Sequence, residues 1–168
     1  MDGTIKVMDF GLSAIVPNSS PHSDEIYELS GETGSLRYMA PEVASRSPYN
    51  HKADVYSFGI MLWELVTFRK PFERMNREEY YEKVVYGGQR PEISKKFPND
   101  LAKLICDCWD VDPQERPTFQ AVVLALAEMQ GNEIAKNRDR HRGGNGGGGR
   151  VSKFVKRLST PVRHSSWF

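Results

Sequence analysis

Cysteine is scarce in this chain: only two of its 168 residues are Cys, and they stand close together as Cys106 and Cys108. So small a number excludes a fold that several disulfides hold together. The two cysteines lie within a helical pattern, with no second Cys or His cluster nearby. We therefore expect reduced thiols in a core rather than metal ligands.

Long apolar runs are also absent. No stretch approaches the roughly 20 apolar residues that cross a bilayer, and the N-terminus lacks the basic-then-apolar pattern of a signal peptide. We expect a soluble, cytoplasmic protein. Its composition, with 39% hydrophobic and 27% charged residues, is typical of a globular domain.

Charge is distributed unevenly along the chain, although the net charge is only +1. Residues 136–168 contain nine Lys or Arg and one acidic residue, and residues 143–149 are almost all glycine. We predict that a domain ends near residue 130 and that 131–168 form a glycine-rich linker and a disordered basic tail. Basic and apolar residues alternate over 150–158, which would allow weak contact with an anionic surface, but a solvated tail is the preferred interpretation and no nucleic-acid partner is expected.

Helical periodicity dominates the middle of the chain. Residues 55–66 are apolar on every face, which predicts a helix buried all round. A capping-box pattern opens a short amphipathic helix over 76–87, and apolar stripes at helical spacing predict two more helices over 101–109 and 119–131. We expect Thr118 to cap the last helix and Gly131 to end it, so the predicted fold is mainly α.

Residues 5–8 are the one strand candidate, because Asp2-Gly3 before them is a hairpin-turn signal. The other strand of such a hairpin has no counterpart in this sequence. The start at Met1 therefore resembles a fragment boundary or an internal methionine.

Four motifs occur in a fixed order. Asp-Phe-Gly stands at 9–11 and Ala-Pro-Glu at 40–42, with a polar segment between them that predicts a mobile loop. Asp-Val-Tyr-Ser-Phe-Gly begins at 54, and Cys-Trp-Asp-Val-Asp-Pro with Arg-Pro-Thr-Phe spans 108–119. This order resembles the C-terminal, large lobe of a protein kinase, and the motif sequences are most similar to those of the tyrosine-kinase-like group of Ser/Thr kinases.

The resemblance implies a domain organisation. Residues 1–130 would be a partial protein kinase domain, with the activation segment at 9–42 and the helical lobe at 43–130. In that family the glycine-rich loop, the Lys strand and the catalytic Asp loop all lie upstream of Asp-Phe-Gly. The resemblance therefore implies an ATP- and Mg²⁺-dependent enzyme in the full-length protein, and a fragment that is inactive alone.

The resemblance also assigns roles to particular residues. Asp9 would bind Mg²⁺, and Phe10 and Gly11 would support the nucleotide site by packing and backbone flexibility. Ser35 would lie in the loop that receives the substrate hydroxyl, which favours Ser or Thr as the acceptor. The structural residues would be Glu42 and Arg116, as a buried ion pair, and Asp54. The Asp54 carboxylate should accept hydrogen bonds and brace the catalytic loop, or be left unsatisfied where that loop is absent.

Regulation by phosphorylation is implied for the polar segment, since a phosphate can order a loop against a cation such as Arg37. The candidate sites are Ser23, Tyr27, Ser30 and Thr33. Protein substrates and an upstream kinase would be the partners. The alternative function is that of a non-catalytic, pseudokinase-like module that binds proteins through its helical lobe.

Overall fold

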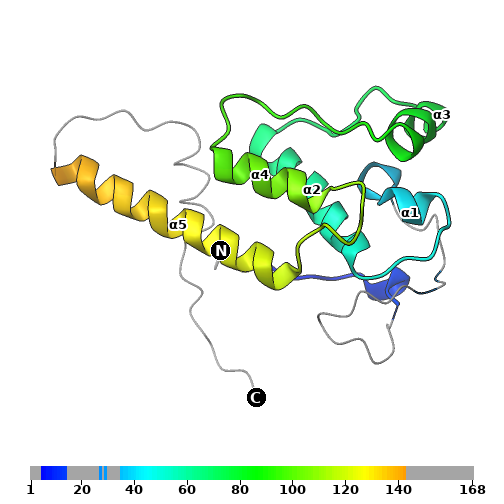
Figure 1. The fold of residues 1–168 in the computed structure, drawn as a ribbon, viewed down its shortest axis with the longest axis horizontal. Coiled ribbons are helices and arrows are strands. Elements are labelled where there is room, and N and C mark those ends of the chain that lie inside the picture. The colour runs from blue at the N-terminus through cyan, green and yellow to red at the C-terminus, as the bar shows by residue number, and fades with distance from the viewer. Residues whose placement is uncertain (1–4, 15–26, 28, 30–34, 143–168) are drawn as a thin grey trace, which may run out of the picture. The chain divides into compact units, whose positions relative to one another are not determined.

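The computed structural model describes residues 5–14, 27, 29 and 35–142, and these residues are mainly helical (Figure 1). The helices are α1 (Pro41–Ala44), α2 (Lys52–Thr67), α3 (Arg77–Tyr80), α4 (Asn99–Cys108) and α5 (Phe119–Arg142), with two 3-10 turns, η1 (Phe10–Leu12) and η2 (Leu36–Tyr38), and a π-helical segment, η3 (Tyr81–Tyr86). The chain divides into two units, one formed by Leu12–Ala125 and the other by residues 1–11 with 126–168. The prediction of a mainly α fold is confirmed.

The predicted strand at residues 5–8 is wrong. These residues have no regular secondary structure and are exposed, and the one β-bridge among the described residues joins Tyr27 to Tyr49. A strand exists only where a neighbouring chain segment accepts and donates its backbone hydrogen bonds. No described residue pairs with 5–8 in this way.

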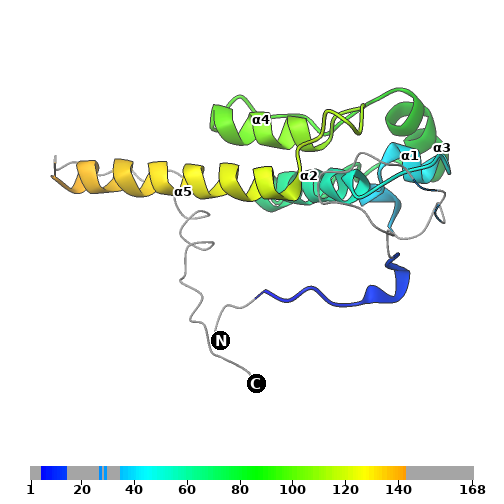
Figure 2. The same ribbon diagram turned by 60° about the horizontal axis from the view of Figure 1, so that its bottom comes forward.

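Helix α2 packs against α4, and both helices can be followed in the two ribbon views (Figure 2). The two helices approach closely because Gly59 has no side chain: a Cβ at this position would lie 2.7 Å from the Cβ of Cys108. The prediction that this helix is buried all round is wrong, since Met61 and Leu65 are 42% and 45% exposed. Among the described residues, packing covers the other faces of α2.

The segment after α2 begins a helix as its capping pattern predicts. The Asn76 side chain accepts a hydrogen bond from the Glu79 backbone at 2.8 Å, and the Glu79 carboxylate accepts one from the Asn76 backbone at 3.2 Å. Beyond Tyr80 the helix widens into the π-helical η3 and ends at Gly87. A π-helical turn has no simple sequence signal, so this change of register could not be predicted.

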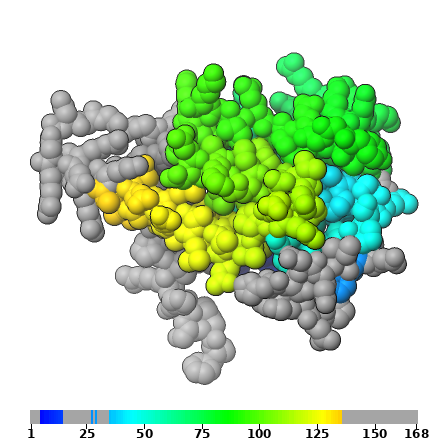
Figure 3. All heavy atoms as spheres, in the orientation of Figure 1, coloured from blue at the N-terminus to red at the C-terminus, as the bar shows by residue number. Residues whose placement is uncertain are grey.

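Helix α4 carries the apolar stripe that predicted it. Leu101, Leu104, Ile105, Cys108 and Trp109 are all buried. On the outer side of α4, which faces the viewer in Figure 3, the helix and the chain that leads into α5 form a continuous surface. The thiol of Cys108 is in the core, where burial raises its pKa to about 12, whereas Cys106 is exposed.

Helix α5 begins as predicted, with the Thr118 hydroxyl accepting a hydrogen bond from the Ala121 backbone at 3.2 Å. The predicted end at Gly131 is wrong, because the helix continues to Arg142. A single glycine costs a helix only about 1 kcal/mol relative to alanine, which its neighbours can offset. The predicted domain boundary near residue 130 thus falls within α5 and stays a prediction. Among the described residues, no helix is both long and apolar enough to span a membrane.

Candidate functional site

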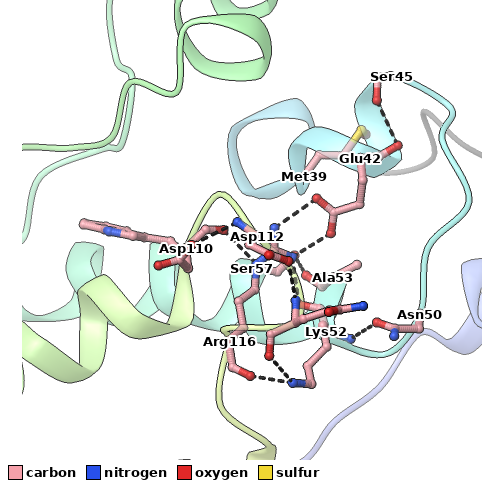
Figure 4. Close-up of polar contacts among 12 residues, drawn as sticks. Met39, Glu42, Ser45, Asn50, Lys52, Ala53, Ser57, Asp110, Asp112 and Arg116 are labelled. Carbon is pink, nitrogen blue, oxygen red and sulfur yellow. Dashed lines mark hydrogen bonds and ion pairs between the residues drawn. The ribbon is translucent and has the colours of Figure 1, made fainter. Parts of the chain in front are cut away.

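A bidentate ion pair joins the Ala-Pro-Glu motif to the turn before α5 (Figure 4). Arg116 Nη1 lies 2.6 Å from Glu42 Oε1, and Nη2 lies 3.0 Å from Oε2. The Arg116 side chain is fully buried and that of Glu42 is 13% exposed. A planar guanidinium that meets both carboxylate oxygens forms a strong and directional contact, so this pair ties two segments 74 residues apart.

The turn that carries Arg116 is shaped by two local hydrogen bonds. The Asp110 carboxylate accepts from the Asp112 backbone, and the Asp112 carboxylate accepts from the Gln114 backbone, each at 2.9 Å. Such bonds between an Asp side chain and the backbone two residues on favour tight turns. Arg116 then closes the turn by donating from Nε to the Asp110 carbonyl at 2.9 Å.

Lys52 completes this buried cluster from the start of α2. Its ammonium donates to the carbonyl of Arg116 at 2.5 Å and to that of Gln114 at 3.4 Å, while Arg116 Nη1 donates to the Lys52 carbonyl at 3.1 Å. Lys52 is only 5% exposed. The guanidinium of Arg116 also stacks over the Tyr56 ring at 5.1 Å. Sequence reasoning missed Lys52, since nothing local distinguishes it from a surface lysine.

The loop that precedes Ala-Pro-Glu is held from three directions. Arg37 donates to the Pro71 carbonyl at 2.7 Å, and Ser57 on α2 donates to the Tyr38 carbonyl at 2.7 Å. Tyr80 on α3 donates to the Met39 carbonyl at 3.0 Å. These contacts position the backbone of residues 37–39 on the helical lobe.

Tyr38 makes a further contact with α2. Its hydroxyl donates to the Glu64 carboxylate at 2.5 Å, and this hydrogen bond raises the pKa of Tyr38. Burial raises the pKa of Tyr80 as well. Both hydroxyls therefore stay protonated at neutral pH and remain donors. Sequence reasoning did not identify the Tyr80 hydroxyl as the donor to the Met39 carbonyl. A Tyr within a buried stripe is nevertheless a signal, because its hydroxyl needs a hydrogen-bond partner.

Ser35 stands at the exposed edge of this loop, next to a hollow of about 240 Å³. The Ser35 carbonyl accepts from the Tyr38 backbone at 3.1 Å, which closes the η2 turn. The hollow is lined by the loop, the residues before α3 and the first part of α3, namely Ser35, Leu36, Arg37, Phe72, Met75, Asn76, Arg77 and Tyr80.

Asp9 lies in a different environment. It adopts a left-handed backbone conformation, with φ of +67°, and residues 5–14 are exposed throughout. No group of three or more His, Cys, Asp or Glu side chains that could hold a metal ion occurs among the described residues. Mg²⁺ bound with ATP takes one or two protein carboxylates beside phosphate and water oxygens, and Asp9 could supply one of them.

Comparison with known proteins decides the family. The sequence profile described as "Protein tyrosine and serine/threonine kinase" matches residues 1–126. The chain belongs to this protein kinase family. It is 35% identical to serine/threonine-protein kinase STY46 of Arabidopsis thaliana over 93% of this chain, and 41% identical to serine/threonine-protein kinase VIK of the same plant over 75%. It is also 38% identical to dual specificity protein kinase shkE of Dictyostelium discoideum over 76% of this chain.

The chain spans only part of these kinases: 26% of STY46, 28% of VIK and 18% of shkE. The profile match begins at residue 1 and covers both Asp-Phe-Gly and Ala-Pro-Glu. The resemblance to the tyrosine-kinase-like group that the motifs indicated is thus supported by these relatives.

Asp54 differs from the expectation drawn from kinases. No hydrogen bond to its carboxylate is found within 5–14, 27, 29 and 35–142, so the expected hydrogen bonds are absent there. The residue is exposed, and water can solvate its charge. The protein around its inner side nevertheless raises the pKa of Asp54 by partial desolvation, while His51 acts to lower it.

Tyr27 is the one candidate phosphorylation site within the described residues. Its backbone N–H donates to the Tyr49 carbonyl at 2.9 Å, and its side chain is partly buried. Ser23, Ser30 and Thr33 lie outside the described residues, as does the basic segment 150–158. Modification of these sites stays a prediction.

Proposed function

We propose that this chain is the substrate-docking portion of a protein kinase that phosphorylates Ser or Thr in other proteins. The observation that carries the proposal is the anchored loop at residues 35–40, fastened by the Glu42–Arg116 pair at one end and by Arg37 at the other. A backbone held in this way keeps its shape when a peptide binds, so less entropy is lost on binding.

Ser35 and the hollow beside it would receive the segment of the substrate next to the acceptor hydroxyl. The proposed preference for Ser and Thr rests on Ser35 and on the printed names of STY46 and VIK. The name of shkE describes dual specificity, so tyrosine is the competing acceptor. Residue Ser35 is exposed and available for a hydrogen bond from a substrate hydroxyl.

ATP would supply the phosphoryl group and Mg²⁺ would neutralise its charge, as in protein kinases generally. We assign Asp9 to the metal, with Phe10 and Gly11 beside it, and further ligands and the catalytic base to groups outside the described residues. The 168-residue chain alone should therefore show no ATP turnover. An upstream kinase acting on residues 23–33 is proposed as the regulator.

A chimera tests this function. Residues 1–130 would be joined to the upstream, ATP-binding segment of VIK, and transfer of labelled phosphate from ATP to casein would be measured. We expect phosphoserine and phosphothreonine, and loss of both in the Asp9→Asn chimera. Phosphotyrosine alone would contradict the proposed acceptor, and full activity of the Asp9→Asn chimera would contradict the role of Asp9.

A non-catalytic interaction module is the second candidate function. It would use the fixed surface of the helical lobe around residues 37–39, which needs no nucleotide. A folded chimera that labels no protein, alongside an active VIK kinase domain under the same conditions, would select this alternative.

A further inference from the structure

A second hollow, of about 420 Å³, lies on the other side of the segment that links α2 to α3. It is formed by residues 69–75, by the strip 89–92 that follows η3, and by Trp63 of α2. Phe72 and Met75 line this hollow and also the one beside Ser35, so the two hollows adjoin. We call the second hollow the basic groove.

The rim of the basic groove carries unpaired positive charge. Arg69, Lys70 and Arg74 are exposed, and their side chains form no ion pair or hydrogen bond within the described part of the chain. Glu73 and Glu92 are the two carboxylates in the wall, and neither pairs with these cations. Three basic side chains thus face solvent around one concavity.

A fourth cation is fixed in the wall. Arg90 donates from Nε to the Trp109 carbonyl at 2.9 Å and from Nη1 to the Gln89 carbonyl at 3.0 Å, and its guanidinium stacks over the Tyr56 ring at 4.9 Å. Its Nη2 is buried and has no hydrogen-bond partner. Backbone carbonyls carry no net charge, so the positive charge of Arg90 is not neutralised by a carboxylate.

The floor of the groove is apolar. Trp63 is buried and its indole N–H donates to the Glu92 carbonyl at 2.9 Å, which fastens the strip 89–92 to α2. Phe72 packs edge to face on Tyr80, with ring centroids 5.3 Å apart. Met75 and Pro91 complete the apolar lining.

We propose that the basic groove binds an acidic segment of a protein partner, with carboxylates or phosphates on its rim and an apolar side chain on its floor. The positive charge on the rim favours an anionic partner. The recessed apolar floor favours a peptide, because a peptide can insert a side chain there. A bilayer surface would meet the rim but would leave Trp63 and Phe72 uncovered. The proposal is independent of phosphoryl transfer.

A binding experiment on the 168-residue chain tests the groove. The probe is a fluorescein-labelled synthetic peptide in which Glu alternates with Leu, followed by fluorescence anisotropy. Counterpart peptides carry Gln in place of Glu, or Gly in place of Leu. We expect both counterparts to bind more weakly, and binding of the Glu-Leu peptide to weaken as salt increases.

Matched charge reversals locate the binding. Arg69→Glu with Arg74→Glu alters the rim, whereas Lys95→Glu with Lys96→Glu makes the same change of charge at exposed residues that do not line the groove. We expect the first pair to weaken peptide binding by about tenfold or more, because two attractive contacts become repulsive, and the second pair by less than about threefold. Circular dichroism would verify that both variants are folded.

Two outcomes would overturn the proposal. Equal losses of peptide affinity in the two double variants would show that the peptide is attracted by net charge alone. The basic residues of 143–168 are present in every variant, so they do not affect this comparison. Phosphatidylserine vesicles that lose affinity only for the Arg69→Glu, Arg74→Glu variant, with no peptide binding by any variant, would identify a membrane-facing surface instead.

Discussion

The two ends of the activation segment differ sharply in how this chain holds them. Ala-Pro-Glu is fixed by the Glu42–Arg116 pair, whose arginine carbonyl is in turn bound by the buried ammonium of Lys52. The chain around Asp-Phe-Gly, in contrast, is exposed at every residue from 5 to 14. Both tripeptides identify the family equally well. The difference teaches that a motif can be recognised without its environment, but that only the Ala-Pro-Glu end has its supporting contacts among the described residues.

Removing Arg116 should cause the largest loss of stability, because it releases the Ala-Pro-Glu end from its supporting contact. Arg116→Leu leaves Glu42 without its partner and removes the hydrogen bonds that Arg116 donates to two carbonyls, so we expect a loss of about 3–5 kcal/mol in the free energy of unfolding. Combining it with Glu42→Leu should restore part of this loss, because no unpaired carboxylate remains. Urea unfolding of the single and double variants measures both. Identical midpoints for Arg116→Leu and the double variant would show that Glu42 contributes nothing as a partner.

Gly59→Ala should cause the second-largest loss in the free energy of unfolding, because it forces α2 and α4 apart. The new Cβ would lie 2.7 Å from the Cβ of Cys108, and overpacking of this kind destabilises a core by about 1–3 kcal/mol. Gly131→Ala is the matched control, since nothing lies within 4 Å of a Cβ there. It should be neutral or slightly stabilising by helix propensity. A Gly59→Ala variant as stable as the parent would mean that the two helices do not pack as closely as described.

Asp54 should have a smaller effect, which depends on pH. Its pKa is raised in the folded state, so the folded chain binds this proton more tightly than the unfolded chain does. The contribution of Asp54 to stability is therefore greatest at acidic pH and is lost as pH rises through the raised pKa. We expect Asp54→Asn to flatten this part of the profile and to leave stability at neutral pH unchanged or increased. A fall in stability at neutral pH would indicate that the carboxylate accepts a stabilising hydrogen bond.

The smallest effect is expected at the Asp-Phe-Gly end. Val7 is 82% exposed, so Val7→Ser should alter the free energy of unfolding by no more than about 0.5 kcal/mol in the 168-residue chain. The comparison is Val122→Ser, at a residue that is 1% exposed and should lose far more. A Val7→Ser loss as large as that of Val122→Ser would show that the Asp-Phe-Gly end is packed in a core rather than exposed.

Local signals were sufficient for much of the fold. The capping box at Asn76 and Glu79 and the apolar stripe of residues 101–109 each predicted a helix that the structure contains, because caps and stripes act over a few residues. The order of four motifs was sufficient for the family. The pairing of Glu42 with Arg116 came from that resemblance rather than from any local pattern.

Tertiary contacts decided the rest. Whether Met61 and Leu65 are covered and whether residues 5–8 pair as a strand depend on segments distant in sequence. The continuation of α5 through Gly131 instead reflects the small cost of one glycine within a long helix. The same holds for the site, since Lys52 and Tyr80 act through carbonyls that lie 64 and 41 residues away. Every residue has a backbone carbonyl that can accept a hydrogen bond. The sequence at the accepting residue therefore gives no sign that Lys52 or Tyr80 will bind there. The sequence alone therefore determined the family and most of the helices, whereas only the folded chain determined which side chains hold the loop at residues 35–40.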